Sequence, residues 1–323
     1  MKVKIESNAY YLPEKKEKNE DLKIDNPDWD MSKISEKTGI FTRSISHSKQ
    51  TAVDLAFEAG IALLESVSCK KDIDLVVLVT QSPDYVLPTS ACILQNKLGL
   101  SKKCMAFDIN LGCSGFVYAL SVAGSLIESG SAKKGLIFCA DTYTKYIDKF
   151  DRTCRPLFSD GASATLLTAS DSDDIGSFVF GTDGSGYDKL IVKESGARKT
   201  SKDSVGVLEM FGADVFLFTL SVVPACINKL LNKSELYIED IDLFVFHQAS
   251  QLVLENLIRT MSIDESKVFI NLADVGNTVS ASIPIALKDA ERQEKLKDGD
   301  IVMLVGFGVG LSWGATLITW REI

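Results

Sequence analysis

The sequence predicts an α/β fold in which two similar α/β units pack together. Short apolar runs bounded by polar or glycine residues alternate with longer segments of helical apolar spacing. The order of these patterns in the first half recurs in the second. The chain has 323 residues, enough for two domains of roughly 150 residues each. Hydrophobic residues make up 46% of it, so a sizeable core is expected.

Five apolar runs are predicted strands, because short runs that are apolar throughout are typical of sheets buried on both faces. They cover residues 74–80, 104–109, 135–140, 242–246 and 300–305. Helices are predicted at about 51–68, 89–98, 114–129, 212–231, 249–261 and 280–293. Gly99 and Gly130 follow two of these helices, as glycine often does at a helix end. The alternation predicts mixed α/β layers.

An internal repeat relates the two halves. Residues 73–82 resemble residues 241–250. Three further pairs follow in the same order: 105–110 with 268–271, 135–141 with 300–306, and 161–167 with 312–318. Buried strands resemble one another by chance, but four pairs in one order favour a duplication. We expect the first half to cover residues 1–170 and the second 171–323, with the Ser-, Asp- and Gly-rich segment 171–206 linking them.

Composition excludes several function classes. The formal net charge of −9 argues against nucleic acid or an anionic membrane as the main partner, because both require basic surface. No uncharged apolar run reaches about 18 residues, so no membrane-spanning helix is expected. The N-terminus lacks the apolar run of a signal peptide. These features predict a cytoplasmic protein.

The cysteines and histidines argue against a metal site. Seven cysteines, none in a C-x-x-C arrangement, predict reduced thiols in a reducing compartment. Only two histidines are present, and His47 lies in a polar setting that predicts surface exposure. The acidic run 171–174 is interpreted as a solvated loop. We therefore expect no bound metal.

Cys113 lies where a predicted strand passes through a Gly-Cys-Ser-Gly turn into a predicted helix. The N-terminus of a helix carries partial positive charge and unpaired N–H groups, which favour the nucleophilic thiolate. The flanking glycines leave room for a substrate. Many buried cysteines are simply small core residues, however. The local sequence leaves both interpretations open.

His247 and Asn277 are the other catalytic candidates. His247 ends a predicted strand, where α/β proteins commonly place reactive groups, although a satisfied core histidine is an alternative. Asn277 lies in a Gly-Asn loop, where a turn residue or helix cap is the alternative. The repeat places this loop at the position that Cys113 holds in the first half. Two-fold packing of the halves would bring the three side chains together.

A cysteine, a histidine and an asparagine suit thioester chemistry. The thiolate accepts an acyl group, and the other two side chains hydrogen-bond the carbonyl oxygen of a second thioester while carbon dioxide leaves. The Gly-rich turn 306–310 offers backbone N–H groups that could form an oxyanion hole with the N–H of Cys113. A tight turn without this role is the alternative.

These residues belong to segments that span nearly the whole chain in a recognisable order. The segments are Tyr11–Glu14, Lys37–Ile40, Leu87–Ala91, Asn110–Phe116, Asp151–Arg152, Phe158–Gly161, His247–Ala249, Gly276–Thr278 and Gly306–Gly314. In them the chain resembles the β-ketoacyl-acyl carrier protein synthase III family of the thiolase superfamily. The resemblance implies a five-layered α-β-α-β-α thiolase-like fold and a homodimer. It implies decarboxylative Claisen condensation of an acyl-CoA with a malonyl thioester, giving a β-ketoacyl thioester.

The resemblance also implies roles at the reaction centre. Cys113 corresponds to the acyl-accepting nucleophile, and His247 with Asn277 to the decarboxylation pair. Phe307 corresponds to an aromatic residue behind the site. The backbone N–H of Val309 corresponds to the second oxyanion-hole donor, at a position where glycine is more usual.

Other implied roles concern substrate binding. Trp29 and Arg152 resemble the pair that flanks the adenine of coenzyme A, although the segment after Trp29 is longer than in typical members. Gly212 resembles a pantetheine contact, and Ser250 stands where a coenzyme A contact is more often asparagine. Leu87 matches a position that reaches across the dimer and closes the partner's acyl pocket. Coenzyme A enters as a substrate thioester, and no cofactor is implied.

The family's basic patch for an acidic carrier protein is weakened here. Its positions read Leu217, Leu252 and Thr260, and only Arg259 remains basic. Because carrier docking depends on complementary charge, the sequence predicts a divergent member serving a specialised pathway. Two alternatives to condensation stay open: transfer of the acyl group to a hydroxyl, amine or small metabolite, and a non-catalytic subunit of a heterodimer.

Overall fold

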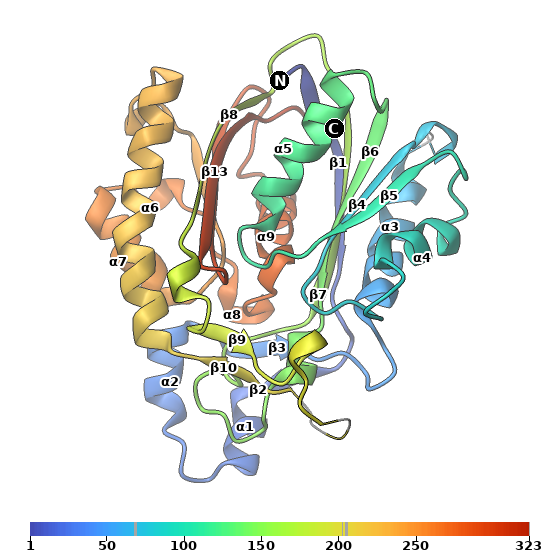
Figure 1. Cartoon of the computed structure of the whole chain (residues 1–323). Coiled ribbons are helices and arrows are strands. Elements are labelled where there is room, and N and C mark those ends of the chain that lie inside the picture. The colour runs from blue at the N-terminus through green and yellow to red at the C-terminus, as the bar shows by residue number, and fades with distance from the viewer. Residues whose placement is uncertain (68–69, 202, 204–205, 323) are drawn as a thin grey trace.

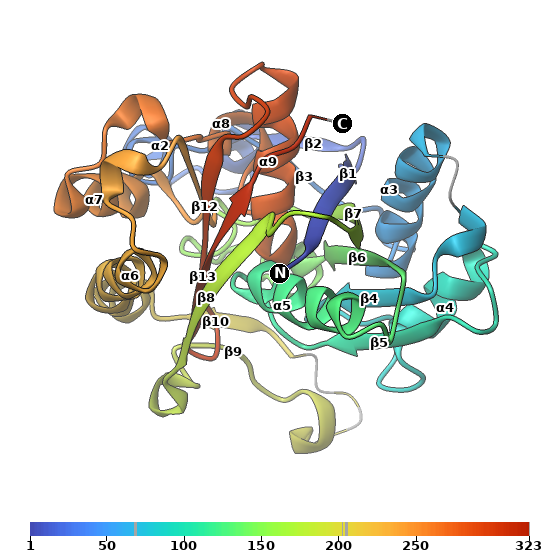
Figure 2. The same cartoon turned by 90° about the horizontal axis from the view of Figure 1, so that it is seen from above.

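The computed structural model describes residues 1–67, 70–201, 203 and 206–322. Two sheets stand side by side with two helices between them, and further helices cover the outer face of each sheet (Figures 1 and 2). The α-β-α-β-α order of layers confirms the predicted fold class.

The first sheet takes all its strands from residues 3–169. Its order is β1 (Val3–Tyr11), β7 (Gly161–Ala169), β6 (Lys134–Asp141), β4 (Leu75–Val79) and β5 (Met105–Ile109). The strands β6, β4 and β5 are parallel, whereas β7 and β1 are each antiparallel to their neighbours. Every residue of β4 is buried, as expected for a strand covered on both faces.

The second sheet repeats this pattern with strands from residues 175–319. Its order is β11 (Leu243–Phe246), β12 (Ile301–Gly308), β13 (Ser312–Thr319) and β8 (Ile175–Thr182), with only β11 and β12 parallel. The counterpart of β5 is reduced to one parallel bridge between Val268 and Phe244. The strands therefore follow the internal repeat in order and direction.

One expectation about the second half was wrong. The segment 171–206 was interpreted as a link, but it contains the edge strand β8 and a short strand, β9 (Leu190–Val192). The strand β8 contains two glycines and a serine among its eight residues, and six of its residues pair with β13. This Ser and Gly content hides the strand in the sequence because it lowers the apolar periodicity on which the prediction depends.

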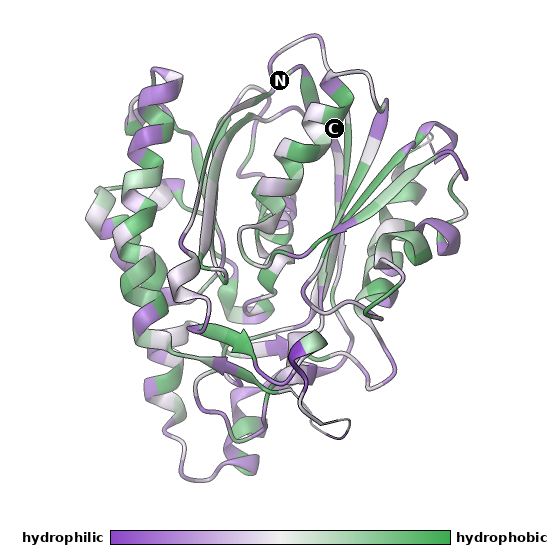
Figure 3. Ribbon diagram, viewed as in Figure 1, coloured by the Kyte–Doolittle hydropathy of each residue, from purple (hydrophilic) through white to green (hydrophobic). Residues whose placement is uncertain are grey.

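The central layer consists of α5 (Gly115–Glu128) and α9 (Ser282–Arg292). Both helices bury apolar side chains against the inner faces of the two sheets, which makes them the core shared by both halves. Figure 3 shows hydrophobic residues concentrated along the strands and on these central helices.

The outer layers hold the two flanking pairs of helices. On the first sheet lie α3 (Ala52–Ser66) and α4 (Ser90–Lys97), and on the second lie α6 (Gly212–Ser234) and α7 (Gln251–Met261). The helix α3 begins with a capping box at Thr51, which fixes its start. Gly99 and Gly130 adopt positive φ values of 62° and 76°, which are typical of glycines at helix ends.

The helix α6 is long and apolar enough to cross a membrane, by length and composition alone. The sequence analysis did not anticipate this. In the structure α6 packs on the second sheet through a buried stripe that includes Val223, Ile227 and Leu230. A core helix of this kind meets the same criterion, so the finding is weak evidence for a membrane span.

A cap of short elements covers one end of both sheets (Figure 1). It surrounds the entrance to the site described below. Its members are β2 (Lys16–Lys18), α1 (Asn19–Asp25), α2 (Met31–Thr38), β3 (Thr42–Ser44), β9, β10 (Leu208–Met210) and α8 (Leu272–Val275).

The described cysteines are all free thiols, as the sequence predicted: Cys92, Cys104, Cys113, Cys139, Cys154 and Cys226. Cys69 lies outside the described residues.

The two halves approach most closely where β12 passes the start of α5. A Cβ atom on Gly306 would lie 2.7 Å from the carbonyl oxygen of Cys113 and 2.7 Å from Cα of Ser114. Nearby, the Ser114 and Ser312 hydroxyls lie 2.8 Å apart and hydrogen-bond across the same boundary. Since both atoms facing Gly306 belong to backbone, no side chain there can move aside.

We expect Gly306→Ala to lower the free energy of unfolding by about 1–3 kcal/mol, because the added methyl group overpacks a backbone contact. Urea unfolding measures the change. Gly184→Ala is the matched control, since nothing lies within 4 Å of a Cβ at that position. Equal stability of the two variants would contradict the proposed tight contact.

Candidate active site

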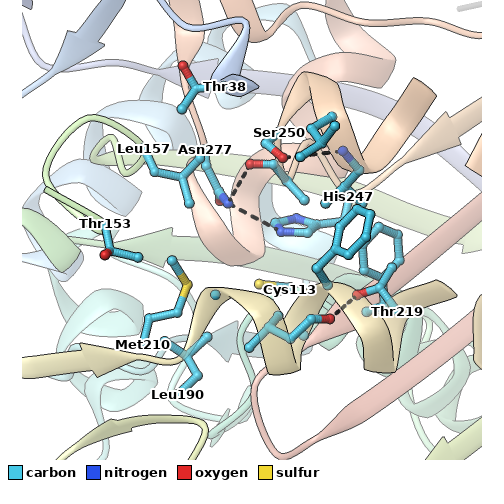
Figure 4. A pocket seen from close by; sticks show the side chains of 18 of the residues that line it. Thr38, Cys113, Thr153, Leu157, Leu190, Met210, Thr219, His247, Ser250 and Asn277 are labelled. Carbon is cyan, nitrogen blue, oxygen red and sulfur yellow. Dashed lines mark hydrogen bonds between the residues drawn. The ribbon is translucent and has the colours of Figure 1, made fainter. Parts of the chain in front are cut away.

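A pocket of about 460 Å³ runs from the cap to the junction of the two halves. Cys113, His247 and Asn277 line its buried end, and their side chains are turned toward the same space (Figure 4). Each of the three residues is at most 4% exposed. The outer end is lined by exposed residues that include Lys37 and Leu252. The structure thus brings together the three residues that the repeat predicted would converge.

Cys113 is held at the turn between β5 and α5, one residue before the N-cap Ser114. Burial, with a smaller contribution from the nearby Asp141 carboxylate, raises the pKa of its thiol to about 12. Hydrogen bonds from the backbone N–H groups of Val309 and of Cys113 itself act in the opposite direction. Contrary to the expectation that the helix start favours the thiolate, desolvation outweighs the backbone donors and favours the thiol.

The same two backbone N–H groups are the expected oxyanion-hole donors, and both are directed at the sulfur of Cys113. Glycine is required beside them. A Cβ on Gly308 would lie 2.8 Å from Sγ of Cys113, and Gly308 has a φ of 158°. A carbonyl carbon bound to Sγ would place its oxygen near these donors.

His247 follows β11, and its backbone N–H donates to the carbonyl of Val305 at 2.7 Å. Its Nδ1 lies 2.6 Å from Oγ of Ser282, which also accepts from the backbone N–H of Gln248 at 3.4 Å. Donation from the Ser282 hydroxyl to Nδ1 corresponds to the tautomer that carries its proton on Nε2, the form in which the ring is a donor toward the pocket. Burial lowers the pKa of His247 to about 3, so the ring is neutral.

Asn277 is oriented by two backbone contacts. Its Oδ1 accepts from the N–H of Val279 at 2.9 Å, and its Nδ2 donates to the carbonyl of Ala249 at 3.3 Å. Its Nδ2 also lies 3.5 Å from Nε2 of His247. With the ring proton on Nε2, the two nitrogens can donate together to one oxygen in the pocket. Such a pair of donors stabilises an enolate oxygen.

Phe307 packs against the edge of the His247 ring, with ring centroids 5.6 Å apart and planes at 82°. It is 2% exposed and lines the buried end of the pocket. The contact holds the imidazole in place and excludes water from its apolar side.

Asp141 connects loops of both halves beside the site. It ends β6, and its carboxylate accepts hydrogen bonds from the backbone N–H of Gln81 at 2.8 Å and of Ser280 at 3.2 Å. The Ser280 hydroxyl also donates to it. Complete burial raises the pKa of Asp141 to about 7, against the lowering effect of these bonds. The carboxylate therefore connects the first half to the loop that carries Asn277.

The substrate-binding candidates divide into two groups. Gly212 and Ser250 line the pocket, where Gly212 begins α6 and Ser250 caps α7 by accepting from Val253 N–H at 3.4 Å. Arg152 is exposed and does not line the pocket, although the adjacent Thr153 does.

Trp29 is largely buried. It is 9% exposed and packs with Leu22 and Ile34 in a small cluster with α1 and α2. The structure therefore gives no support to a role for Trp29 against adenine.

Leu87 does not line the pocket of its own chain. It is 79% exposed, within an apolar run that continues through the exposed Tyr85 and Val86. His47 is exposed, as the sequence predicted. Within the ranges that the structure describes, no group of three or more His, Cys, Asp or Glu residues is placed to hold a metal ion.

Two sequence families match the chain. Residues 107–184 match "3-Oxoacyl-[acyl-carrier-protein (ACP)] synthase III", and residues 231–320 match its C-terminal counterpart. The β-ketoacyl-[acyl-carrier-protein] synthase III of Clostridioides difficile (strain 630) is 38% identical over 319 residues, covering 96% of each chain. That of Clostridium novyi (strain NT) is 39% identical over 328 residues, covering 99% of each. The chain belongs to the 3-oxoacyl-[acyl-carrier-protein] synthase III family.

Solved structures agree with this assignment. A crystal structure of a 3-oxoacyl-(acyl-carrier-protein) synthase III superimposes with a TM-score of 0.96 at 42% identity, covering 99% of this chain and 100% of the other. The enzyme of Thermus thermophilus gives a TM-score of 0.91 at 34% identity, covering 99% of each. The family assignment predicted from the sequence is thereby confirmed, and the chain is a condensing enzyme of the acyltransferase type.

Sequence reasoning missed two residues of this synthase. Ser282, which contacts the His247 ring, lies in the predicted helix 280–293. Asp141 follows the predicted strand 135–140, where a polar residue after an apolar run was a detectable sign. Nothing in the local sequence indicated that Ser282 faces the site.

We expect Ser282→Ala to slow decarboxylation of a malonyl thioester by about tenfold, because the Nδ1 partner that selects the Nε2–H tautomer is lost. Acylation of Cys113 should change much less. Stopped-flow carbon dioxide release and intact-protein mass spectrometry measure the two steps. Ser282→Thr keeps the hydroxyl and should restore the rate; wild-type decarboxylation by Ser282→Ala would contradict the assignment.

Because the His247 ring is neutral above a pKa of about 3, its protonation should not limit decarboxylation between about pH 5 and about pH 8. A change near pH 7 should come instead from Asp141 and vanish in Asp141→Asn. The pH profile of carbon dioxide release tests this. An inflection near pH 6.5 that persists in Asp141→Asn would show that His247 titrates normally.

Proposed function

We propose that this synthase condenses an acyl-CoA with a malonyl thioester through an acyl-Cys113 intermediate. The observation that carries the proposal is the 3.5 Å pairing of the His247 and Asn277 nitrogens in the pocket that Cys113 lines. These two donors face the space where a second thioester would sit once the cysteine is acylated.

In the first step, Sγ of Cys113 attacks the carbonyl carbon of the acyl-CoA. The new S–C bond forms, the bond to the coenzyme A sulfur breaks, and the thiol proton passes to that leaving sulfur. The backbone N–H groups of Cys113 and Val309 stabilise the oxyanion of the tetrahedral intermediate. Because burial raises the thiol pKa to about 12, this mechanism requires the thiol to lose its proton as the S–C bond forms.

In the second step, the malonyl C–C bond breaks and carbon dioxide leaves. The electron pair of the broken C–C bond enters the enolate, whose oxygen accepts hydrogen bonds from His247 Nε2 and Asn277 Nδ2. The enolate carbon then attacks the acyl-Cys113 carbonyl, and the S–C bond breaks. The cysteine takes up one proton, and a β-ketoacyl thioester is released.

We propose malonyl-acyl carrier protein as the second substrate, in line with the names of the relatives. The outer surface of the pocket sets a limit on how the carrier docks. Leu217 and Leu252 are 66% and 40% exposed at the positions of the expected basic patch, and the guanidinium of Arg259 donates to Asn256 at 2.6 Å. Carrier docking would therefore depend less on charge than in typical members, and coenzyme A remains the alternative carrier.

We further propose a homodimer in the cytoplasm that needs no cofactor. The exposed apolar run Tyr85–Leu87 supports a second copy as its cover, because such runs are costly to leave in water. The net charge of −9 agrees with a partner other than nucleic acid or an anionic membrane. The association state in solution is the measurement that tests the dimer.

The test of the proposed function separates the two half-reactions. Wild-type protein mixed with acyl-CoAs should gain the mass of one acyl group, and Cys113→Ala should gain none. His247→Ala and Asn277→Ala should still acylate but lose decarboxylation by about 10²-fold or more, because each removes an oxyanion donor.

Three outcomes would contradict the proposal. Full condensation by Cys113→Ala would exclude the acyl-enzyme. Acylation followed by transfer to a hydroxyl or amine, without carbon dioxide release, would favour the alternative acyltransferase. Failure of every acyl-CoA to label Cys113 would favour a non-catalytic subunit.

A further inference from the structure

A second, smaller hollow of about 300 Å³ is lined in part by the oxyanion-hole segment. We call it the polar hollow, because hydroxyl and amide groups line much of it. Val309 and Gly310 belong to it but not to the main pocket, and Leu190 is shared by both. The polar side chains that line it are Gln81, Asn110, Tyr143, Tyr146, Tyr187 and Ser195.

The order of the two half-reactions assigns this hollow to the acyl group. After the first step the main pocket has to be vacated, since His247 and Asn277 need to receive the second thioester there. The acyl chain on Cys113 must then extend away from these donors. When the carbonyl oxygen lies near the N–H of Val309, the rest of the acyl chain extends into the polar hollow, which Val309 also lines.

Two of the polar side chains that line this hollow are hydrogen-bonded to each other. The Tyr143 hydroxyl donates to Oε1 of Gln81 at 2.5 Å. Tyr143 is 4% exposed and packs with Cys113 in one cluster. A Cβ on Gly112 would lie 2.5 Å from that same Oε1, which places the Gln81 amide beside the residue that precedes the nucleophile.

The Gln81 amide has unused hydrogen-bonding capacity. Its oxygen accepts from Tyr143, whereas its Nε2 makes no hydrogen bond to any residue that the structure describes. An apolar acyl chain lying against this nitrogen would bury two N–H donors without a partner, which costs binding energy. An acyl group with an oxygen near the thioester would satisfy one of them.

Resting on the proposed function, we propose that Gln81 selects a short acyl group that carries a hydroxyl or oxo oxygen near the thioester carbonyl. Val309 contributes to the selection by size. Its Cγ1 lies 2.9 Å from a Cβ built on Gly112, so it narrows the space beside Gly112 that the Gln81 amide also borders. Gln81 and Tyr143 would act on the acylation step alone, because neither lines the main pocket.

The experiment compares acyl-CoAs of matched length on the intact enzyme. The rate at which Cys113 gains acyl mass is measured with butyryl-CoA, 3-hydroxybutyryl-CoA and acetoacetyl-CoA. We expect at least one of the oxygenated groups to have a kcat/KM for acylation about tenfold above that of butyryl-CoA, the discrimination that one hydrogen bond to a substrate oxygen supplies. The two oxygenated arms distinguish a hydroxyl from an oxo group.

Variants assign that preference to Gln81. Gln81→Met is close in size but has no N–H donor, and it should bring the ratio of oxygenated to butyryl acylation near one. Tyr143→Phe frees the Gln81 amide to rotate and should reduce the ratio. Tyr237→Phe is the control, because it removes the hydroxyl of an exposed tyrosine that does not line the hollow, and it should keep the ratio.

Each result has a defined meaning. Equal or faster acylation by butyryl-CoA in the wild type would overturn the inference while leaving the acyl-Cys113 mechanism intact. An unchanged ratio in a folded Gln81→Met, checked by its unfolding midpoint, would overturn it as well. Absence of labelling by all three thioesters, and by the wider acyl-CoA set, would instead defeat the proposed function.

Discussion

The site depends on one close contact, the passage of β12 over the turn that carries Cys113. Gly306 and Gly308 bring the backbone of the second half against the carbonyl and sulfur of this residue. This close approach lets the N–H of Val309, in the second half, donate to the sulfur of Cys113, in the first half. Asp141 and Ser280 fasten the neighbouring loops across the same boundary. A larger residue at either glycine would therefore disturb packing and chemistry together.

Burial then determines the protonation states on which the reaction depends. Removal from water holds the Cys113 thiol and the His247 imidazole in their neutral forms. A neutral imidazole whose Nδ1 is bonded to Ser282 presents a donor at Nε2, beside the donor of Asn277. Two neutral donors of this kind can stabilise an enolate oxygen, whereas burial disfavours a thiolate–imidazolium pair. The thiol then loses its proton as it reacts with the substrate.

The strands and helices that follow apolar periodicity were predictable, including β4, α5 and β12. Prediction failed where the sequence departs from that periodicity. The edge strand β8 has little apolar alternation because two glycines and a serine interrupt it, although it pairs with β13 in the sheet. The burial of Trp29 against Leu22 and Ile34 likewise could not be predicted from family resemblance.

The sequence by itself determined the duplicated α/β architecture and the three reactive residue types, because buried strands and glycine turns leave local patterns that repeat. Only the tertiary structure decided which groups face those residues. Ser282, Asp141 and Gln81 reach the site from distant segments, and their roles follow from distances that no local pattern encodes. The pKa values were decided there too, since desolvation depends on everything packed around a group.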